Sequence, residues 1–494
     1  SLKPNTIQHI GKMSEKNRPT PVSFYESGNS IYELVGDGKN NFFAKYDLLS
    51  GSIETCEEIH EGGQAIVPLT DELSRNGVVL LPMEVAEFGS LDDLEEEIQA
   101  FIHKYVQLSS FGEMISTKYV LLSWVYDRFE TIPYLRFLGD YGSGKSRAEK
   151  VIGGICYKPI FAGGSTTPSP IFRIIQLYRG TLIIVEADFS RSDMAAEITK
   201  ILNCGYSKGT PVLRSEGNKN GEFEPKAYNV FSPKILATRK AFADVALESR
   251  CITERVRPKD RKDIPLHLPD EFYKQAQQLR NKLLMFRFKN YLEVSYNPSL
   301  EIPGVEPRIN QVMVPILSMV DDEDKKQELV KFITEYNRGI IDQRADSTPA
   351  VILQAIVSLK DTGELSYKMI AKYVNEKRDL LHCERALQPA SIGRINKNEF
   401  GFEVRRPGNV AHIIWDKKLG EELCRRYGVE LSIDSQRNED NVNDVSDVND
   451  VSYKETQQMF IEAEPNESPG NEEQTNKPNI PNFLSTTDIQ SKDI

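Results

Sequence analysis

Residues 138–146 have the sequence LGDYGSGKS, and this stretch decides the fold. It fits the pattern G-x-x-x-x-G-K-[ST] in full, between an apolar run at 134–138 and a helical pattern at 145–156. Glycines in such a loop let backbone N–H groups close around a phosphate, and the helix N-terminus adds the positive end of a dipole. We therefore expect a phosphate-binding loop made of Gly139, Asp140, Tyr141, Gly142, Ser143, Gly144, Lys145 and Ser146.

The last two residues of this loop have separate expected roles. Lys145 is expected to reach the β- and γ-phosphates of a nucleotide, and Ser146 to ligate Mg²⁺. The sequence therefore predicts ATP and Mg²⁺ as cofactors and ATP hydrolysis as the reaction.

A second apolar strand, predicted at 181–185, leads into two acids, Glu186 and Asp188. ATP hydrolysis needs one carboxylate to hold Mg²⁺ and another to polarise the attacking water. Glu186 is the candidate for the water. Because Val185 stands where an aspartate is usual, either Glu186 covers both roles, or Asp188 or Asp193 supplies the metal carboxylate.

A third apolar strand, predicted at 232–237, is followed by Thr238. Thr238 stands where AAA+ ATPases place a residue that senses the γ-phosphate. Twelve residues later, Arg250 is a candidate to act in trans on the nucleotide of a neighbouring subunit, where it would stabilise transition-state charge. This role for Arg250 requires the protein to oligomerise.

Between the second and third strands, 210–214 and 222–228 flank a polar turn and predict a β-hairpin. In a ring of subunits, this hairpin would carry Lys219 into the central pore, where the lysine can contact a nucleic-acid backbone.

The segment 347–430 has its own pattern, with a helix at 366–374, a second at 389–399 and a two-strand ribbon at 402–415. That is the layout of a winged helix-turn-helix, which places its second helix in a DNA groove and its wing on phosphates. Winged helices also serve as protein-interaction modules. The candidate DNA contacts here are Arg394, Lys397, Arg405 and Arg406.

Composition narrows the class of protein. Hydrophobic residues make up 39% and charged residues 27%, as in globular proteins. No apolar run approaches the roughly 20 residues of a transmembrane helix, so we expect a cytoplasmic protein with no membrane partner. Six scattered cysteines without a CxxC pair predict neither a disulfide framework nor a zinc site.

The segment from about 105 to 427 resembles the MCM-like AAA+ helicases of mobile genetic elements, such as those of staphylococcal cassette chromosomes, phages and plasmids. The resemblance rests on motifs in a fixed order: the run at 134–138, the phosphate loop, EADF at 186–189, the hairpin, LAT at 236–238, Ser249 with Arg250, and the winged helix. It implies an α/β fold with an AAA+ P-loop ATPase core, a small N-terminal domain and a C-terminal winged helix.

The same resemblance implies a homo-oligomeric ring, a hexamer, that translocates on DNA in the replication of a mobile element. Single-stranded DNA would occupy the pore, and duplex DNA the winged helix. Arg280 or Arg287, in a long helix predicted at 269–291, would be a second nucleotide sensor. Two positions depart from the family pattern: Val185 replaces the metal-binding aspartate, and Thr238 stands where many relatives have asparagine.

The expected domains follow from these patterns. Short alternating stretches predict strands between 23 and 81, and apolar spacing predicts helices at 91–105 and 118–129. In chain order we expect a flexible leader at 1–22, an N-terminal domain of partly β structure at 23–110, an AAA+ ATPase domain at 111–300, a helical linker at 301–346, the winged helix-turn-helix at 347–430 and a disordered acidic tail at 431–494.

Three functions remain open on sequence alone. The first is an ATP-driven DNA helicase or translocase. The second is a remodeller or loader that assembles on DNA and hydrolyses ATP without unwinding. The third is a DNA-binding regulator whose assembly ATP controls, which the valine at 185 favours. A kinase is disfavoured because no lid for a substrate phosphate and no paired catalytic base accompany the loop.

The tail carries most of the net charge and supplies a first prediction. The formal net charge is −12, and residues 434–494 contain 14 acidic and 4 basic residues. If this polyanion competes with DNA for basic surfaces, deleting 434–494 should strengthen DNA binding at low salt, and less so at high salt, where charges are screened. Fluorescence anisotropy of labelled DNA measures the effect, and an unchanged affinity would reject the competition.

Overall fold

The computed structural model describes residues 19–163, 166–185, 187, 193–217, 222–345, 347–363, 365–379 and 386–431. The expected leader up to residue 18 and the acidic tail from residue 432 lie outside these ranges. So do the candidate site residues Glu186, Asp188 and Lys219, whose expected roles stay predictions.

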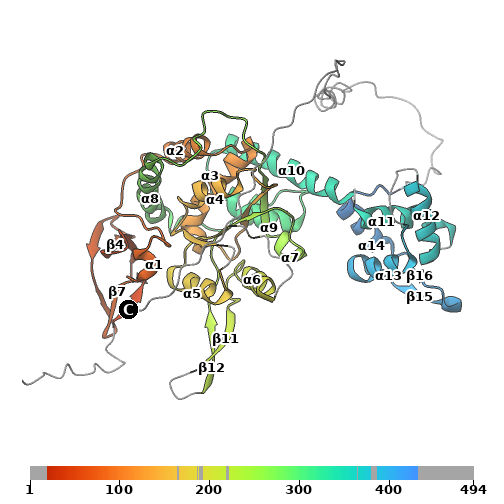
Figure 1. The fold of residues 1–494 in the computed structure, drawn as a ribbon, viewed down its shortest axis with the longest axis horizontal. Helices are drawn as coiled ribbons and strands as arrows, with labels where there is room; N and C mark the ends of the chain where they lie inside the picture. Colours follow the sequence, from red (N-terminus) through yellow and green to blue (C-terminus); the bar gives the residue numbers. More distant parts are fainter. Residues whose placement is uncertain are drawn as a thin grey trace, which may run out of the picture. The chain divides into compact units, whose positions relative to one another are not determined.

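Within the described residues, five strands form a parallel sheet in the order β14-β8-β13-β10-β9 (Figure 1). β8 and β13 are buried at every position, as is typical of a parallel sheet that is covered on both faces. The expected α/β fold with a mostly parallel sheet is confirmed. The strands are β8 (Tyr134–Leu138), β9 (Ile160–Gly163), β10 (Leu182–Val185), β13 (Lys234–Thr238) and β14 (Cys251–Arg255).

Helix α4 (Lys145–Gly153) follows β8 and packs across β8, β10 and β13. It ends earlier than the predicted 156. A Cβ on Gly153 would lie 2.7 Å from Ile183 Cγ1, so this glycine lets the helix approach β10 closely. The other helices of this part are α2 (Leu91–Tyr105), α3 (Ser110–Val125), α5 (Pro168–Tyr178), α6 (Asp193–Cys204), α7 (Val245–Glu248) and α8 (Asp270–Asn290).

Helix α3 begins at Ser110, whereas apolar spacing predicts a start at 118. Ser109 caps the helix by accepting a hydrogen bond from the backbone N–H of Gly112 at 2.9 Å. The pattern misses the first two turns because Ser116 and Thr117 are buried although they are polar. Burial of polar residues in this helix therefore hides its apolar period.

The N-terminal part is rich in strands, as expected for 23–81. One antiparallel sheet has the order β2-β3-β4-β5, and a smaller sheet has the order β1-β7-β6. Both lie before helix α2 in the chain, and β3 and β4 contribute to the same hydrophobic core as the parallel sheet. The strands are β1 (Thr20–Val22), β2 (Phe24–Ser27), β3 (Ser30–Gly36), β4 (Asn41–Asp47), β5 (Ile53–Cys56), β6 (Ile59–Glu61) and β7 (Gln64–Pro68).

A buried ionic cluster joins β3 to the helices around the parallel sheet. Glu33 of β3 is 1% exposed and accepts from Lys158 Nζ at 2.8 Å and Arg287 Nε at 2.6 Å. The hydroxyl of Tyr157 donates to both carboxylate oxygens of Glu33, at 2.9 and 3.0 Å. Arg287 also pairs with Asp127 at 2.7 Å. Two carboxylates, Glu33 and Asp127, thus compensate two buried cations, and Glu33 is shared by both cations.

The C-terminal part has a separate hydrophobic core. It follows α9 (Pro307–Leu317) and the long helix α10 (Glu323–Ala345), and it contains α11 (Thr348–Leu359), α12 (Tyr367–Asp379), α13 (Pro389–Ile395), the ribbon strands β15 (Val404–Arg405) and β16 (His412–Ile413), and α14 (Lys417–Tyr427). The second predicted helix, 389–399, is α-helical only to Ile395 and continues as a π-turn at Asn396–Phe400.

The ribbon is shorter than its predicted span of 402–415. The strands predicted at 402–406 and 410–415 pair only at Val404–Arg405 and His412–Ile413. The turn expected between them lies at Pro407–Asn409, with positive φ at Gly408 and Asn409. Helix α14 was not predicted, although Leu423, Cys424 and Tyr427 show helical spacing and are buried.

The two tryptophans of the chain belong to different cores. Trp124 is fully buried in the first core and donates its indole N–H to the backbone carbonyl of Ile155 at 3.1 Å. Trp415 packs half-buried against the second core, where its ring stacks on Phe402 with centroids 5.5 Å apart.

No helix in the described part of the chain combines the length and the apolar character that crossing a membrane requires.

The ionic cluster supplies a stability prediction. Glu33→Gln keeps the shape of the side chain but leaves Lys158 and Arg287 without their shared carboxylate. Removing one partner of a buried pair costs about 3–5 kcal/mol, so we expect a clearly lower urea midpoint of unfolding by circular dichroism. The control is Glu54→Gln, which breaks an exposed pair with Lys45 in the same sheet and should change the midpoint little. Equal shifts in both variants would contradict a stabilising role for the cluster.

Candidate site at the carboxyl edge of the parallel sheet

The loop after β8 depends on three glycines for its course. The N–H of Gly139 donates to the carbonyl of Thr238 at 3.2 Å, and a Cβ on Gly139 would lie 2.4 Å from the carbonyl oxygen of Val256. Gly142 and Gly144 have φ values of +76° and +98°, which L side chains rarely adopt. Glycine is therefore required at these positions of the predicted phosphate loop.

Lys145 opens helix α4 and lies against the loop. Its Nζ donates to the carbonyl of Asp140 at 2.6 Å and lies 3.5 Å from Ser143 Oγ. Ser143 is buried, whereas Ser146 and Tyr141 are exposed. The first N–H groups of an α-helix have no intrahelical partner, so the start of α4 adds donors and a positive dipole end beside Lys145. This arrangement can bind an anion such as a phosphate.

Thr238 ends strand β13 next to the loop. β13 pairs with β8 so that Thr238 is opposite Leu138, the residue before the loop. Thr238 is 1% exposed, and its hydroxyl finds no hydrogen-bond partner among the described residues. A buried hydroxyl left in this state costs about 1–3 kcal/mol, which makes Thr238 a candidate for contact with a bound ligand.

Strand β10 ends at the same edge of the sheet. It pairs in parallel with β13, so its carboxyl end lies on the side of Thr238. Val185, half-buried, is its last residue, and Glu186 and Asp188 lie beyond the described part of the chain. In the ranges that the structure describes, no group of three or more His, Cys, Asp or Glu side chains can hold a metal ion. The expected Mg²⁺ ligands Ser146, Glu186 and Asp188 therefore stay a prediction.

Arg250 lies at the opposite edge of the sheet. Its carbonyl accepts from the N–H of Tyr134, the first residue of β8, whereas the loop follows the last residue of β8. At about 3.3 Å per residue, β8 separates the two edges by roughly 13 Å. Arg250 donates from Nη1 to Asn203 Oδ1 of α6, and its guanidinium lies 5.1 Å from the ring centre of Tyr206. Within one chain, Arg250 is thus remote from the loop, and a role for it at a phosphate requires a second subunit.

Arg280 and Arg287, the two candidates for a second sensor, both have protein partners. Arg280 donates to the carbonyls of Leu81 and Gly154 and to Gln277. Burial lowers the pKa of Arg280 to about 10. Arg287 is fully buried in the ionic cluster with Glu33, where every guanidinium nitrogen donates a hydrogen bond. Neither guanidinium therefore lies at the loop. Each one instead hydrogen-bonds residues of other segments and so stabilises the packing of α8.

The predicted hairpin consists of β11 (Val212–Gly217) and β12 (Phe223–Tyr228) and projects from the part of the fold that contains α5 and α6 (Figure 1). Glu216 pairs with Arg173 of α5 at 2.5 Å. Leu213 and Phe223 are 67% and 77% exposed, an apolar feature that charge-based reasoning about Lys219 did not single out.

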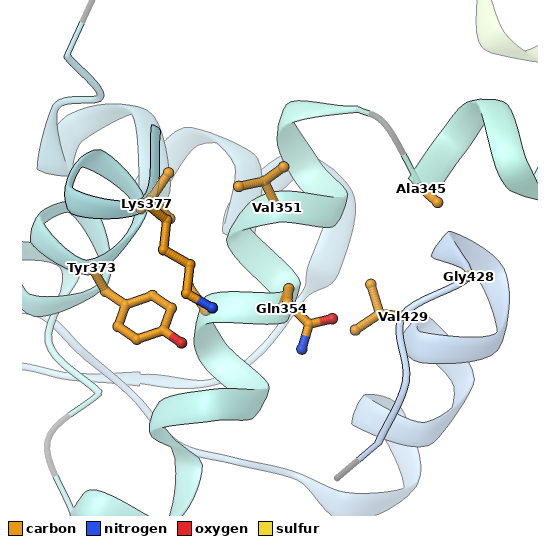
Figure 2. Close-up of a pocket in the computed structure, with 9 residues that line it drawn as sticks. Ala345, Val351, Gln354, Tyr373, Lys377, Gly428 and Val429 are labelled. Carbon is orange, nitrogen blue, oxygen red and sulfur yellow. The ribbon is translucent and has the colours of Figure 1, made fainter. Parts of the chain in front are cut away.

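In the C-terminal part, the candidate DNA contacts are all exposed. Arg394 lies on α13, Lys397 on the π-turn after it, and Arg405 and Arg406 at the ribbon. A separate cavity of about 190 Å³ is lined mainly by apolar groups from the end of α10, from α11 and α12, and from the residues after α14 (Figure 2). Lys377 and Tyr373 are at this cavity, which contains none of the predicted site residues.

No protein-family model and no curated protein matches the chain. Among solved structures, the chain is similar to the apo form of the NrS-1 C-terminal region, at 12% identity and a TM-score of 0.34, over 78% of this chain and 96% of that one. It is also similar to the JCV helicase, at 13% identity and a TM-score of 0.24, over 50% of this chain and 61% of that one. Similarities as distant as these assign no function to the chain. A function has to be argued from the residues of the chain itself.

The hydroxyl of Thr238 supplies a prediction that needs no ligand. Thr238→Val removes a group without a partner and keeps its shape, so we expect the free energy of unfolding to stay the same or to rise by about 1 kcal/mol. The control is Thr253→Val. Thr253 Oγ1 accepts from Arg136 Nε and Nη2 at 3.0 and 2.8 Å, so removing this hydroxyl should lower the free energy of unfolding. Urea unfolding measures both variants. If Thr238→Val lowers the free energy of unfolding as much as the control does, the Thr238 hydroxyl has a hydrogen-bond partner within the protein.

Proposed function

We propose that the chain is an ATP-driven DNA helicase or translocase with a P-loop core. The observation that carries the proposal is the convergence at one sheet edge of the glycine-dependent loop, the ammonium of Lys145 and the orphan hydroxyl of Thr238. The glycine-rich loop at the N-terminus of α4 can bind the phosphates of a nucleotide through its backbone N–H groups. The unpartnered hydroxyl of Thr238 can hydrogen-bond the terminal phosphate. These groups fit a nucleoside triphosphate.

In this proposal, bound ATP with Mg²⁺ supplies the phosphoanhydride that is cleaved. The backbone N–H groups of 139–144 and the Lys145 ammonium would hold the β- and γ-phosphates, and Ser146 would bind Mg²⁺, which neutralises phosphate charge. Thr238 hydrogen-bonds the γ-phosphate or the attacking water, and Glu186 orients and polarises that water. The carboxylate that would hold Mg²⁺ is Glu186 itself, Asp188 or Asp193.

The proposed motor is a ring of identical subunits, a hexamer by the family resemblance. Its support in this chain is the position of Arg250, which lies at the edge of the sheet away from the loop of its own subunit. An arginine there can complete the site of a neighbour by stabilising charge in the transition state. The site would then lie between subunits, and hydrolysis would require assembly.

DNA contact is assigned to two places. The projecting hairpin offers Lys219 to the backbone of single-stranded DNA in the pore. The C-terminal part, which we interpret as a winged helix, offers Arg394, Lys397, Arg405 and Arg406 to duplex phosphates. Replication of a mobile element is the biological setting that the family resemblance suggests.

One observation favours a second function. Val185, at the end of β10, is aliphatic where a motor usually has its metal carboxylate. If no acid substitutes for it, ATP would bind without being turned over and would control assembly of a DNA-binding regulator. A loader that hydrolyses ATP without displacing a strand is the intermediate case, and a strand-displacement assay separates it from a helicase.

The test is the ATPase rate of the full chain with and without single-stranded DNA, in the wild type and in Lys145→Ala. We expect DNA-stimulated turnover that falls at least about a hundredfold in Lys145→Ala, because a loop cation that neutralises transition-state charge is removed. Lys150→Ala is the matched control, since Lys150 is an exposed lysine on the same helix and lies over the ring of Tyr273.

The outcomes separate the proposals. Turnover that persists in Lys145→Ala would reject the assigned site. A wild type that binds ATP without turnover would replace the motor with the regulator.

A further inference from the structure

Lys234, the first residue of β13, is a fully buried lysine without a carboxylate partner among the described residues. Its Nζ donates to the carbonyls of Gly205 at 3.1 Å, Val230 at 2.9 Å and Ser232 at 2.8 Å, and lies 3.2 Å from Ser232 Oγ. Burial lowers the pKa of this ammonium well below its usual value, whereas oxygen acceptors on several sides favour its charged form. A buried lysine that has uncharged oxygen acceptors and no carboxylate partner among the described residues costs free energy, so its position in the fold needs an explanation from its contacts.

The acceptors come from both ends of the β11–β12 hairpin. Gly205 follows helix α6 and precedes β11, and Val230 follows β12. Thr210 adds a bond on the entry side, where its hydroxyl donates to the carbonyl of Cys204 at 2.8 Å. Lys234 therefore closes the base of the hairpin by binding the segment that enters it and the segment that leaves it.

Gly205 is matched to this lysine. A Cβ on Gly205 would lie 2.5 Å from Lys234 Nζ and 2.5 Å from the carbonyl oxygen of Val230. No larger residue fits unless the ammonium or the backbone moves. The close approach of three chain segments thus depends on the pair Gly205 and Lys234 together.

Two elements connect this base to the candidate nucleotide site. β13 carries Lys234 at one end and Thr238 at the other, and each of its residues is buried. Helix α6 begins at Asp193, soon after the predicted acids, and its end leads to Gly205. A shift at the phosphate edge that moves β13 or α6 as a rigid element is therefore passed to the base of the hairpin.

We propose that Lys234 is a positioning residue that couples the phosphate-loop edge of the sheet to the β11–β12 hairpin by fixing the base of the hairpin to the strand that carries Thr238. This inference rests on the proposed function, in which the loop binds ATP and the hairpin contacts DNA. Lys234 touches neither ligand and acts through the segments that it binds.

The experiment compares ATPase rates of the full chain with and without single-stranded DNA in the wild type and in Lys234→Ala. We expect the ratio of the two rates to fall at least about fivefold in the variant, the lower end of typical coupling between sites. Propylammonium added to the solution should restore the ratio by filling the cavity with a three-donor cation. Tetramethylammonium, which has no N–H group, should not restore it.

Lys118→Ala is the matched control. Lys118 is also buried, but its ammonium pairs with Glu95 on α2 and, among the described residues, forms no hydrogen bond to the base of the hairpin, so this variant should lose stability and keep the ratio. A ratio unchanged in Lys234→Ala, or equally reduced in Lys118→Ala, would overturn the coupling while leaving the ATPase intact. A wild type without DNA-stimulated turnover would instead overturn the proposed function.

A measurement on the wild type covers the case in which Lys234→Ala does not fold. Amide hydrogen exchange at 204–206 and 229–232 should change when ATP is added, because the base of the hairpin responds to the phosphate edge. Exchange that changes only around 139–146 would overturn the proposal.

Discussion

Parallel pairing of β8, β13 and β10 is the constraint on which the rest of the structure depends. Because parallel strands end at a common edge, the loop after Leu138, the hydroxyl of Thr238 and the end of β10 lie together although they are far apart in the sequence. The same rule places Arg250 and Lys234 at the other edge. One edge is thus suited to binding an anion, and the other to contacts with the base of the hairpin.

Ion pairs as well as apolar contacts join the N-terminal strands to the parallel sheet and its helices. Glu33 brings a carboxylate from β3 into contact with Lys158 and Arg287, which lie beside the parallel sheet and on α8. Buried ions contribute little net stability when paired but cost much when one partner is removed, so they favour one arrangement over alternatives. These contacts attach β3 to the residues beside the parallel sheet and to α8.

Sequence reasoning located β8 and α2 to the residue, because a complete motif or a regular apolar period marked each of them. It also placed the hairpin and the long helix α8 closely. It missed the start of α3, where polar residues are buried, and the whole of α14. At the site, local patterns predicted the loop and Thr238, which lie at one edge of the sheet and whose roles stay predictions.

The roles of Glu33, Lys234 and Arg287 could not be read from local sequence. Each is a charged residue whose partners come from segments remote in the chain, and periodicity assigns such residues to a solvated face. Only the tertiary fold reveals that their charges are buried and compensated.

The placement of one tryptophan in each core gives the unmodified protein two optical reporters. Trp124 is sealed from water and hydrogen-bonded to a carbonyl, whereas Trp415 is half-buried and stacked on Phe402. An indole in an apolar interior emits at shorter wavelength than one in contact with water. The intrinsic fluorescence spectrum is therefore a sum of two overlapping contributions, one from each core, and its shift to longer wavelength on unfolding reports on both cores without a label.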